Sequence, residues 1–148
     1  MSSGAWVVLV AVALAVAFGT YRGLTDGHFR GTHKIRGAEA VEDAAVVSVL
    51  EGTPWADQLG ERATFVQFSS AFCAPCRATR RILTDVAAAE DGIAHVEIDA
   101  EQHLDVVRRL GILRTPTTLV LDAAGAEVTR ALGAPTRDQV MRTVAALG

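Results

Sequence analysis

The sequence lacks several features that would indicate other classes of protein. It has no excess of basic charge, because 14 Lys and Arg residues are set against 17 Asp and Glu residues. Nucleic-acid binding is therefore not predicted, since a phosphate backbone requires a broad basic surface. Only two cysteines occur among the 148 residues, which excludes a scaffold held together by several disulfides. Half of the residues are apolar, enough for the core of one domain plus an appendage.

The longest apolar run lies at the N-terminus. Residues 5–18 are all apolar, and the run stays uncharged to residue 21. This length is near the lower limit of roughly 17 residues for a helix that spans a bilayer, so residues 1–21 are predicted to form a membrane anchor. The alternative is a cleaved signal peptide with Ala15-Val16-Ala17 as its cleavage site. Against that alternative, no Lys or Arg precedes the apolar run.

Basic residues follow the apolar run within a short distance, and they indicate its orientation. They are Arg22, Arg30, Lys34 and Arg36. Because Lys and Arg near the end of a spanning helix tend to stay in the cytoplasm, a single-pass protein with its C-terminal part on the cytoplasmic face is predicted. The extracytoplasmic face is the alternative. Residues 22–43 combine glycines with charged side chains and predict a flexible stalk, followed by a domain over residues 44–148.

Strand-like and helix-like patterns alternate along this domain, which predicts an α/β fold. Residues 63–69 are rich in β-branched and aromatic side chains and predict a buried strand, and residues 74–89 have the spacing of an amphipathic helix. Thr136 and Gln139 have the spacing of a capping box and predict a final helix. The other predicted elements are a strand at 44–50, a short helix at 55–59, a strand at 93–98, a helix at 102–110, and a hairpin of strands 117–121 and 126–132 with its turn at 122–125.

The two cysteines stand where the buried strand is expected to give way to the amphipathic helix. Unpaired backbone N–H groups at a helix N-terminus favour negative charge, so Cys73 is the predicted nucleophilic thiolate. Cys76 lies one helical turn further on, close enough to form a disulfide with Cys73, and is the predicted resolving thiol. Pro75 suits the first turn of a helix because its missing N–H would have had no partner there.

Two other interpretations of the cysteine pair remain open. It could be half of a zinc site, but the sequence has no second Cys-x-x-Cys and no His-x-x-x-His to complete the four ligands, so no metal is predicted. Cysteine also packs as a small apolar side chain, and the pair could be purely structural.

Three segments of residues 44–148 resemble the thioredoxin family. They are Phe72-Cys73-Ala74-Pro75-Cys76-Arg77, Thr115-Pro116-Thr117 and Leu132-Gly133. The resemblance implies a thioredoxin fold, a central mixed β-sheet flanked by helices, here preceded by one N-terminal transmembrane helix. It also implies that Pro116 follows a cis peptide bond and that five residues support the cysteines and contact the substrate: Phe72, Ala74, Pro75, Thr115 and Pro116.

The sequence departs from the family's pattern near the resolving cysteine. The position of the family's buried Asp is occupied by Gln67, and the position of its neighbouring Lys by His95. Because an amide does not exchange protons as a carboxyl group does, the proton of Cys76 would leave through water, His95 or bulk solvent. Gln67 and His95 are therefore the candidate proton relay, although Gln67 could simply satisfy a buried polar position.

The predicted function is that of a thiol–disulfide oxidoreductase acting as a dithiol reductase of protein disulfides, with no cofactor beyond the redox-active Cys73–Cys76 disulfide. Ala74 and Pro75 place no histidine between the cysteines, unlike the strongly oxidising relatives in this superfamily, so the resemblance implies a reduction potential on the thioredoxin side. The expected partners are proteins that contain disulfides and an upstream electron donor, for which a membrane protein is a candidate. The alternatives are an extracytoplasmic thiol reductase for cytochrome maturation and a redox-silent docking module.

Overall fold

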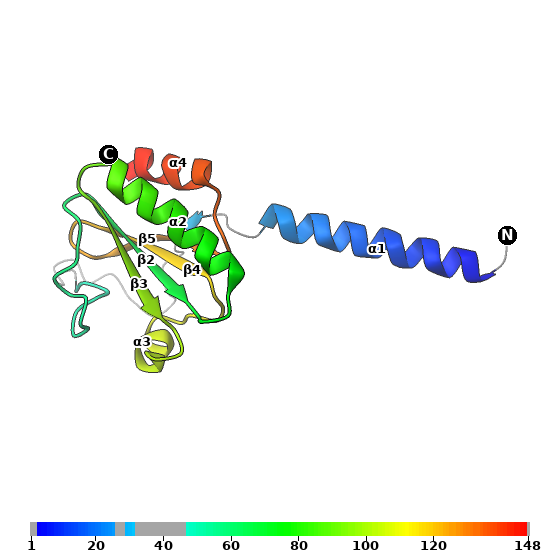
Figure 1. Cartoon of the computed structure of the whole chain (residues 1–148), viewed down its shortest axis with the longest axis horizontal. Helices are drawn as coiled ribbons and strands as arrows, with labels where there is room; N and C mark the ends of the chain where they lie inside the picture. Colours follow the sequence, from blue (N-terminus) through cyan, green and yellow to red (C-terminus); the bar gives the residue numbers. More distant parts are fainter. Residues whose placement is uncertain (1–2, 26–28, 32–46, 148) are drawn as a thin grey trace, which may run out of the picture.

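The computed structural model describes residues 3–25, 29–31 and 47–147. Within these residues the chain forms four helices and five strands, which alternate in the globular part as predicted (Figure 1). Most of the predicted stalk, and residues 44–46 of the predicted first strand, lie outside the described residues.

A single mixed sheet forms the centre of the globular part. Its strands are β1 (Phe29–Gly31), β2 (Ala63–Ser69), β3 (Ile93–Asp99), β4 (Thr117–Asp122) and β5 (Glu127–Leu132), in the order β1-β5-β4-β2-β3. The central strand β2 is parallel to β3 and antiparallel to β4, and the register places Gln67 opposite Glu97. Every residue of β2 is buried, as its β-branched and aromatic composition predicted.

Helices cover both faces of the sheet. On one face, α2 (Ala74–Ala89) and α4 (Arg137–Leu147) lie side by side (Figure 1), and their apolar side chains pack around Phe65. On the other face, α3 (Leu104–Arg109) and the segment before β2 pack around Phe68. Because side chains alternate between the faces of a strand, β2 contributes to both clusters. The predicted fold, a mixed sheet flanked by helices, is confirmed.

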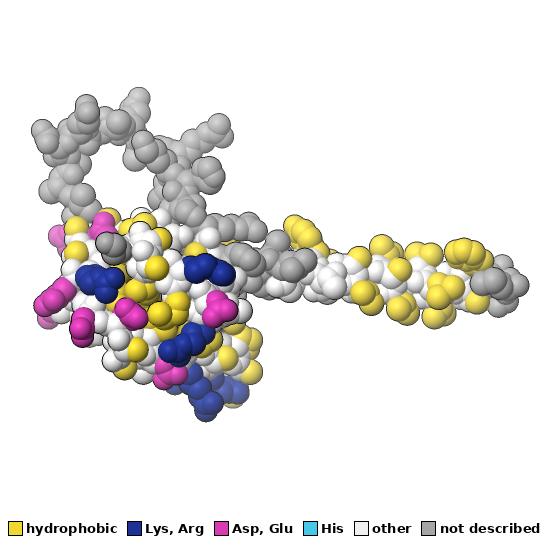
Figure 2. All heavy atoms as spheres, turned by 90° about the horizontal axis from the view of Figure 1, so that it is seen from above, with side chains coloured by type: hydrophobic (Ala, Val, Ile, Leu, Met, Phe, Trp, Pro, Cys, Tyr) yellow, Lys and Arg dark blue, Asp and Glu magenta, His cyan; other side chains and the backbone are white. Residues whose placement is uncertain are grey.

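The N-terminal helix α1 (Ser3–Thr25) extends away from the globular part (Figure 1). The segment Gly4–Gly23, with a mean hydropathy of 2.0 and no buried residues, is long and apolar enough to cross a membrane. Hydrophobic side chains cover this helix, whereas the visible charged side chains gather on the globular part (Figure 2). A signal sequence has the same length and composition, so both interpretations of the N-terminus agree with this helix.

The structure differs from the prediction of a flexible stalk over residues 22–43. The helix α1 continues to Thr25, and Phe29–Gly31 forms the edge strand β1, which pairs with β5. Phe29 explains this pairing, because its ring lies 6.5 Å from that of Phe65 and packs against the core. A strand of three residues is too short to show a two-residue periodicity among the surrounding glycines.

Two further predictions before β2 do not hold. The prediction of a helix at residues 55–59 is wrong, because the backbone there forms turns. Their hydrogen bonds join residues three positions apart, such as the Gln58 N–H to the Trp55 carbonyl at 3.1 Å. No strand forms over residues 47–50, although Leu50 is fully buried. The short apolar runs at residues 47–50 and 55–59 arise because turns, and not regular elements, place some of these side chains in the core.

The turn and cap predicted near the C-terminus are confirmed by their hydrogen bonds. In the β4–β5 hairpin, the Asp122 carboxylate accepts the backbone N–H groups of Ala124 and Ala126, each at 2.9 Å. Before α4, the Thr136 N–H donates to the Gln139 side chain at 2.7 Å, and the Gln139 N–H donates to the Thr136 hydroxyl at 3.3 Å. This reciprocal pair is the predicted capping box.

Candidate active site

Cys73 and Cys76 lie where β2 passes into α2. The buried strand ends at Ser69, and the helix begins at Ala74 with Pro75 in its first turn. The two sulfur atoms form a disulfide with an S–S distance of 2.03 Å and a Cα–Cα distance of 5.2 Å. The structure therefore brings the two predicted thiols together in their oxidised form.

The two cysteines differ in their access to solvent. Cys73 is partly exposed and is the N-cap of α2, whereas Cys76 is only 1% exposed. The backbone N–H of Cys76 donates a hydrogen bond to the Cys73 sulfur at 3.1 Å. This donor and the positive end of the helix favour negative charge on the outer sulfur once the disulfide is reduced. The outer sulfur can thus meet a partner while the inner one stays covered.

The loop that precedes β4 forms the second wall of the site. The Thr115–Pro116 peptide bond is cis, as the resemblance implied, and Pro116 is buried. The hydroxyl groups of Ser70 and Thr115 lie 3.1 Å apart and join this loop to the one before the cysteines. The Gly133 N–H donates to the Pro116 carbonyl at 2.8 Å, so the three segments that carried the resemblance meet at one place.

A cavity of about 500 Å³ lies along this wall, and the end of α1 takes part in it. It is lined by Pro75, Thr115 and Pro116 from the site and by Arg22 and Gly23 from α1. The apolar length of α1, which is long enough to cross a membrane, therefore ends beside the residues that flank the cysteines.

Two large apolar side chains stand exposed on the joined loops. Phe72 is 99% exposed next to Cys73, and Leu113 is 93% exposed in the loop before Pro116. Contiguous exposed apolar surface marks contact sites, and Phe72 directly precedes the reactive Cys73. Leu113 was not predicted from the sequence, although an apolar residue between Gly111 and Pro116 outside any periodic element could have indicated it.

The two candidate proton-relay residues have different surroundings. Gln67 is fully buried, and its side-chain N–H donates to the Cys76 carbonyl at 3.0 Å. His95 lies on β3 with its Nδ1 3.2 Å from the Thr84 hydroxyl, and burial lowers the pKa of its imidazole. The structure thus brings Gln67, and not His95, into contact with Cys76.

A polar cleft reaches Cys76 from the side of β3. Its volume is about 370 Å³, and its lining includes Cys76, Arg80, Glu97 and Asp99. Glu97 was not predicted as a site residue, although its position two residues after His95 on a predicted strand placed it on the same face of the sheet.

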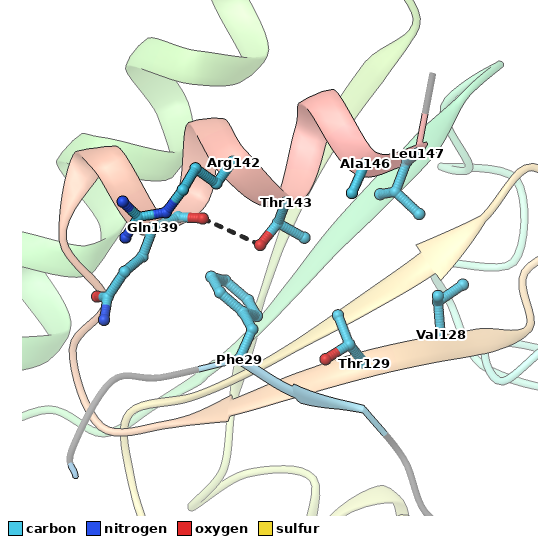
Figure 3. A pocket seen from close by; sticks show the side chains of 8 residues that line it. All are labelled: Phe29, Val128, Thr129, Gln139, Arg142, Thr143, Ala146 and Leu147. Atoms are coloured by element: carbon cyan, nitrogen blue, oxygen red, sulfur yellow. Dashed lines mark hydrogen bonds between the residues drawn. The ribbon is translucent and has the colours of Figure 1, made fainter.

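A separate groove lies between α4 and the strands β1 and β5 (Figure 3). It measures about 430 Å³, and its lining includes Phe29, Arg142 and Leu147. Across its upper wall the Thr143 hydroxyl donates to the Gln139 carbonyl at 3.0 Å (Figure 3). The groove shares no lining residue with the two cavities beside the cysteines, so the disulfide chemistry does not involve it.

Together, the fold and the Cys-x-x-Cys disulfide at a helix N-terminus define a thiol–disulfide oxidoreductase of the thioredoxin type. The sequence profile of the thioredoxin family matches residues 46–146. The chain therefore belongs to the thioredoxin family. Proteins of this family typically act without a cofactor, and within residues 3–25, 29–31 and 47–147 no group of three His, Cys, Asp or Glu side chains could hold a metal ion.

Individual thioredoxins show the same similarity. Thioredoxin of Mycolicibacterium smegmatis is 28% identical over 105 residues, which cover 68% of this chain and 93% of that protein. Thioredoxin H2-1 of Oryza sativa is 27% identical, over 69% of this chain and 76% of its own length. The structure of the reduced thioredoxin pre-protein of Schistosoma mansoni superposes with a TM-score of 0.54 at 21% identity, covering 62% of this chain and 85% of that one. This structural likeness supports the fold.

Proposed function

We propose that this protein is a dithiol reductase of protein disulfides, with Cys73 as the nucleophile and Cys76 as the resolving thiol. The observation that supports it best is the asymmetry of the pair, a partly exposed Cys73 at the helix N-terminus and a Cys76 that is 1% exposed. Phe72, Ala74, Pro75, Thr115 and Pro116 would form the surface that receives the substrate. No cofactor or metal takes part in the proposed reaction.

The reaction proceeds through a mixed disulfide. The Cys73 thiolate attacks one sulfur of the substrate disulfide, forms an S–S bond with it, and displaces the other sulfur as a thiolate. Cys76 then loses its proton and attacks the Cys73 sulfur, which releases the second substrate thiolate. Two electrons pass from the dithiol to the substrate, and the Cys73–Cys76 disulfide remains until an upstream donor reduces it.

The proposed partners are disulfides and donors at a membrane surface. Support comes from the cavity beside Pro75 and Pro116, which is also lined by Arg22 and Gly23 at the end of α1. If α1 spans a bilayer as a single-pass anchor, the redox site lies close to the membrane surface. The division into an anchor at residues 1–21, a stalk at 22–43 and a domain at 44–148 stays a prediction, except that α1 continues to Thr25 and Phe29–Gly31 belongs to the sheet.

A trapping experiment tests the proposed function directly. The full chain with Cys76→Ser is reduced and mixed with insulin, whose disulfides are the probe. The nucleophile should form a disulfide-linked adduct that reducing agent dissolves, whereas Cys73→Ser should form none because its remaining thiol is buried. The absence of an adduct from the Cys76→Ser protein would favour the redox-silent docking module.

The proposed cytoplasmic placement needs a separate test. The basic residues after α1 support it, because they tend to remain in the cytoplasm. Alkaline phosphatase fused to the C-terminus should then be inactive in intact bacterial cells. An active fusion would place the domain outside the cytoplasm and favour a thiol reductase for cytochrome maturation.

A further inference from the structure

The resolving thiol needs a proton acceptor that the family's usual position does not provide. Cys76 is 1% exposed, so bulk solvent has little access to its sulfur. Gln67, which occupies the position of the family's Asp, is an amide that donates its hydrogen bond to the Cys76 carbonyl. His95 does not line the cleft that reaches Cys76, and its Nδ1 contacts Thr84. Neither side chain is placed to accept the proton of the thiol.

The carboxylates of Glu97 and Asp99 line the cleft together with Cys76. They differ in how many of their oxygen atoms accept hydrogen bonds. Both oxygens of Asp99 are engaged, Oδ1 by the Glu101 N–H and Oδ2 by the Gln102 side chain, each at 2.8 Å. The Oε1 atom of Glu97 accepts two hydrogen bonds, whereas its Oε2 atom has no hydrogen-bond partner among the described residues. Of these two carboxylates, Glu97 is therefore the one with an oxygen that accepts no hydrogen bond from the described residues.

The surroundings of Glu97 fix the position of its side chain. The Ser69 hydroxyl donates to Oε1 at 2.7 Å, and the Arg80 guanidinium donates to the same atom at 2.6 Å. Ser69 ends the strand that leads to the cysteines, and Arg80 lies on α2, so both elements of the active site hold this carboxylate. The Glu97 side chain is 25% exposed and can pass a proton on to solvent.

We propose that the Glu97 carboxylate, through water in the cleft, accepts the proton of Cys76 when the mixed disulfide is resolved. The cleft, at about 370 Å³, has room for several water molecules between polar walls. The proton moves from the Cys76 sulfur to Oε2 and then to solvent, while the Cys76 thiolate attacks the Cys73 sulfur. When a donor reduces the disulfide, Glu97 returns a proton to the Cys76 thiolate that is released. This inference rests on the proposed function.

The other charged groups near the cleft have distinct effects. Arg77 and Arg80 stand on α2, and Asp99 and His95 on β3. The guanidinium groups of Arg77 and Arg80 favour a thiolate in the cleft, whereas the carboxylates of Glu97 and Asp99 oppose it. Removing the charge of Glu97 would thus make Cys76 ionise more readily if the residue acted only through its field. A slower reaction after the same change would identify proton transfer.

The test compares Glu97→Gln with Asp85→Asn. Asp85 is a matched control because it is also a carboxylate and loses the same charge in the substitution. It lies on α2, its side chain is 66% exposed, and it does not line the cleft. Reduced full chain is mixed rapidly with insulin, quenched with acid, and alkylated, so that mixed disulfide and products are counted over time. We expect Glu97→Gln to form the mixed disulfide at the normal rate and to resolve it about 10²-fold more slowly. Asp85→Asn should match the unchanged protein in both steps.

Two further readouts separate proton transfer from a structural role. Adding a small carboxylate buffer should restore resolution in Glu97→Gln, and Glu97→Asp should retain part of the rate. The resolution rate of Glu97→Gln should rise about tenfold per pH unit near neutrality, because hydroxide becomes the acceptor, while that of the unchanged protein should vary much less.

The outcomes distinguish this inference from the proposed function. Normal resolution in Glu97→Gln, or a slow rate that buffer does not restore, would overturn the role of Glu97 and leave the reductase intact. If the unchanged protein forms no mixed disulfide at all, the proposed function itself fails.

Discussion

The Phe72 side chain stands almost wholly in solvent beside Cys73, which separates its effect on stability from its effect on activity. At 99% exposure it buries almost no area in the free protein. Phe72→Ala should therefore change the free energy of unfolding by less than about 0.5 kcal/mol, as is usual for exposed positions. Phenylalanine side chains in a core behave differently, because their removal costs about 3–5 kcal/mol.

The same exposure sets the size of the effect on a protein substrate. Complete burial of a phenylalanine side chain gains roughly 1.5–3 kcal/mol. At about 1.4 kcal/mol for each factor of ten, Phe72→Ala should lower kcat/KM toward insulin by about 10-fold to 100-fold. A small aliphatic disulfide offers little apolar area for Phe72 to bury, so its reduction rate should remain within about twofold of normal.

The assay measures insulin reduction, reduction of a small disulfide, and urea-induced unfolding for the same protein preparations. Val47→Ala is the control, because Val47 is also an exposed apolar residue, at 68% exposure. It lies two residues before Val49, whose N–H donates to the Gly125 carbonyl at the end of the sheet away from the cysteines. Val47→Ala should leave all three measurements unchanged. A loss of stability above about 1 kcal/mol, or an equal loss of activity toward both substrates, would refute the reasoning.

Three other predictions concern stability and the buried polar residues. Gly60→Ala should lower the free energy of unfolding in urea by about 1–3 kcal/mol. The added Cβ atom would lie 2.7 Å from the backbone nitrogen of Ala94, which is closer than such atoms approach. His95→Gln should reduce the loss of stability between pH 7 and pH 5. Burial lowers the pKa of His95 in the folded protein below its ordinary 6.5. The unfolded chain therefore binds the proton first, and stability falls as the pH drops below 6.5. Gln67→Asp should speed resolution of the mixed disulfide, because it adds a buried carboxyl group beside Cys76, and should cost about 1–3 kcal/mol through the lost hydrogen bond.

Each of these predictions has an outcome that contradicts it. Normal stability of Gly60→Ala would mean that the backbone around it moves at little cost. An unchanged pH dependence in His95→Gln would show that other groups control the acid limb of stability. Unchanged kinetics in Gln67→Asp would count against proton removal as a slow step at Cys76.

The sequence predicted the central strands and helices because their patterns are long and regular. The run at residues 63–69 is buried on both faces, and the spacing at 74–89 matches the observed helix α2 (Ala74–Ala89). Prediction failed where structure depends on tertiary contacts. The strand β1 at Phe29–Gly31 exists through its pairing with β5, and the turns before β2 bury Leu50 without any period in the sequence.

Prediction of the site was most complete for the residues that a motif contains. The positions of the cysteines and Pro116 follow from short segments, and the structure brings these segments together. Glu97 was missed because its importance depends on the register that places it opposite Gln67 and on the cleft it shares with Cys76. A linear pattern does not show which of several carboxylates on a strand keeps an unengaged oxygen.

The reduction potential of the Cys73–Cys76 pair tests the proposed reductase most directly. It is measured by equilibration of the protein with glutathione or dithiothreitol, followed by alkylation and mass determination. A potential near or below about −230 mV is the result expected of a dithiol that reduces other proteins. A potential of about −120 to −180 mV would contradict the proposal, because a pair with that potential acts as an oxidant or an isomerase.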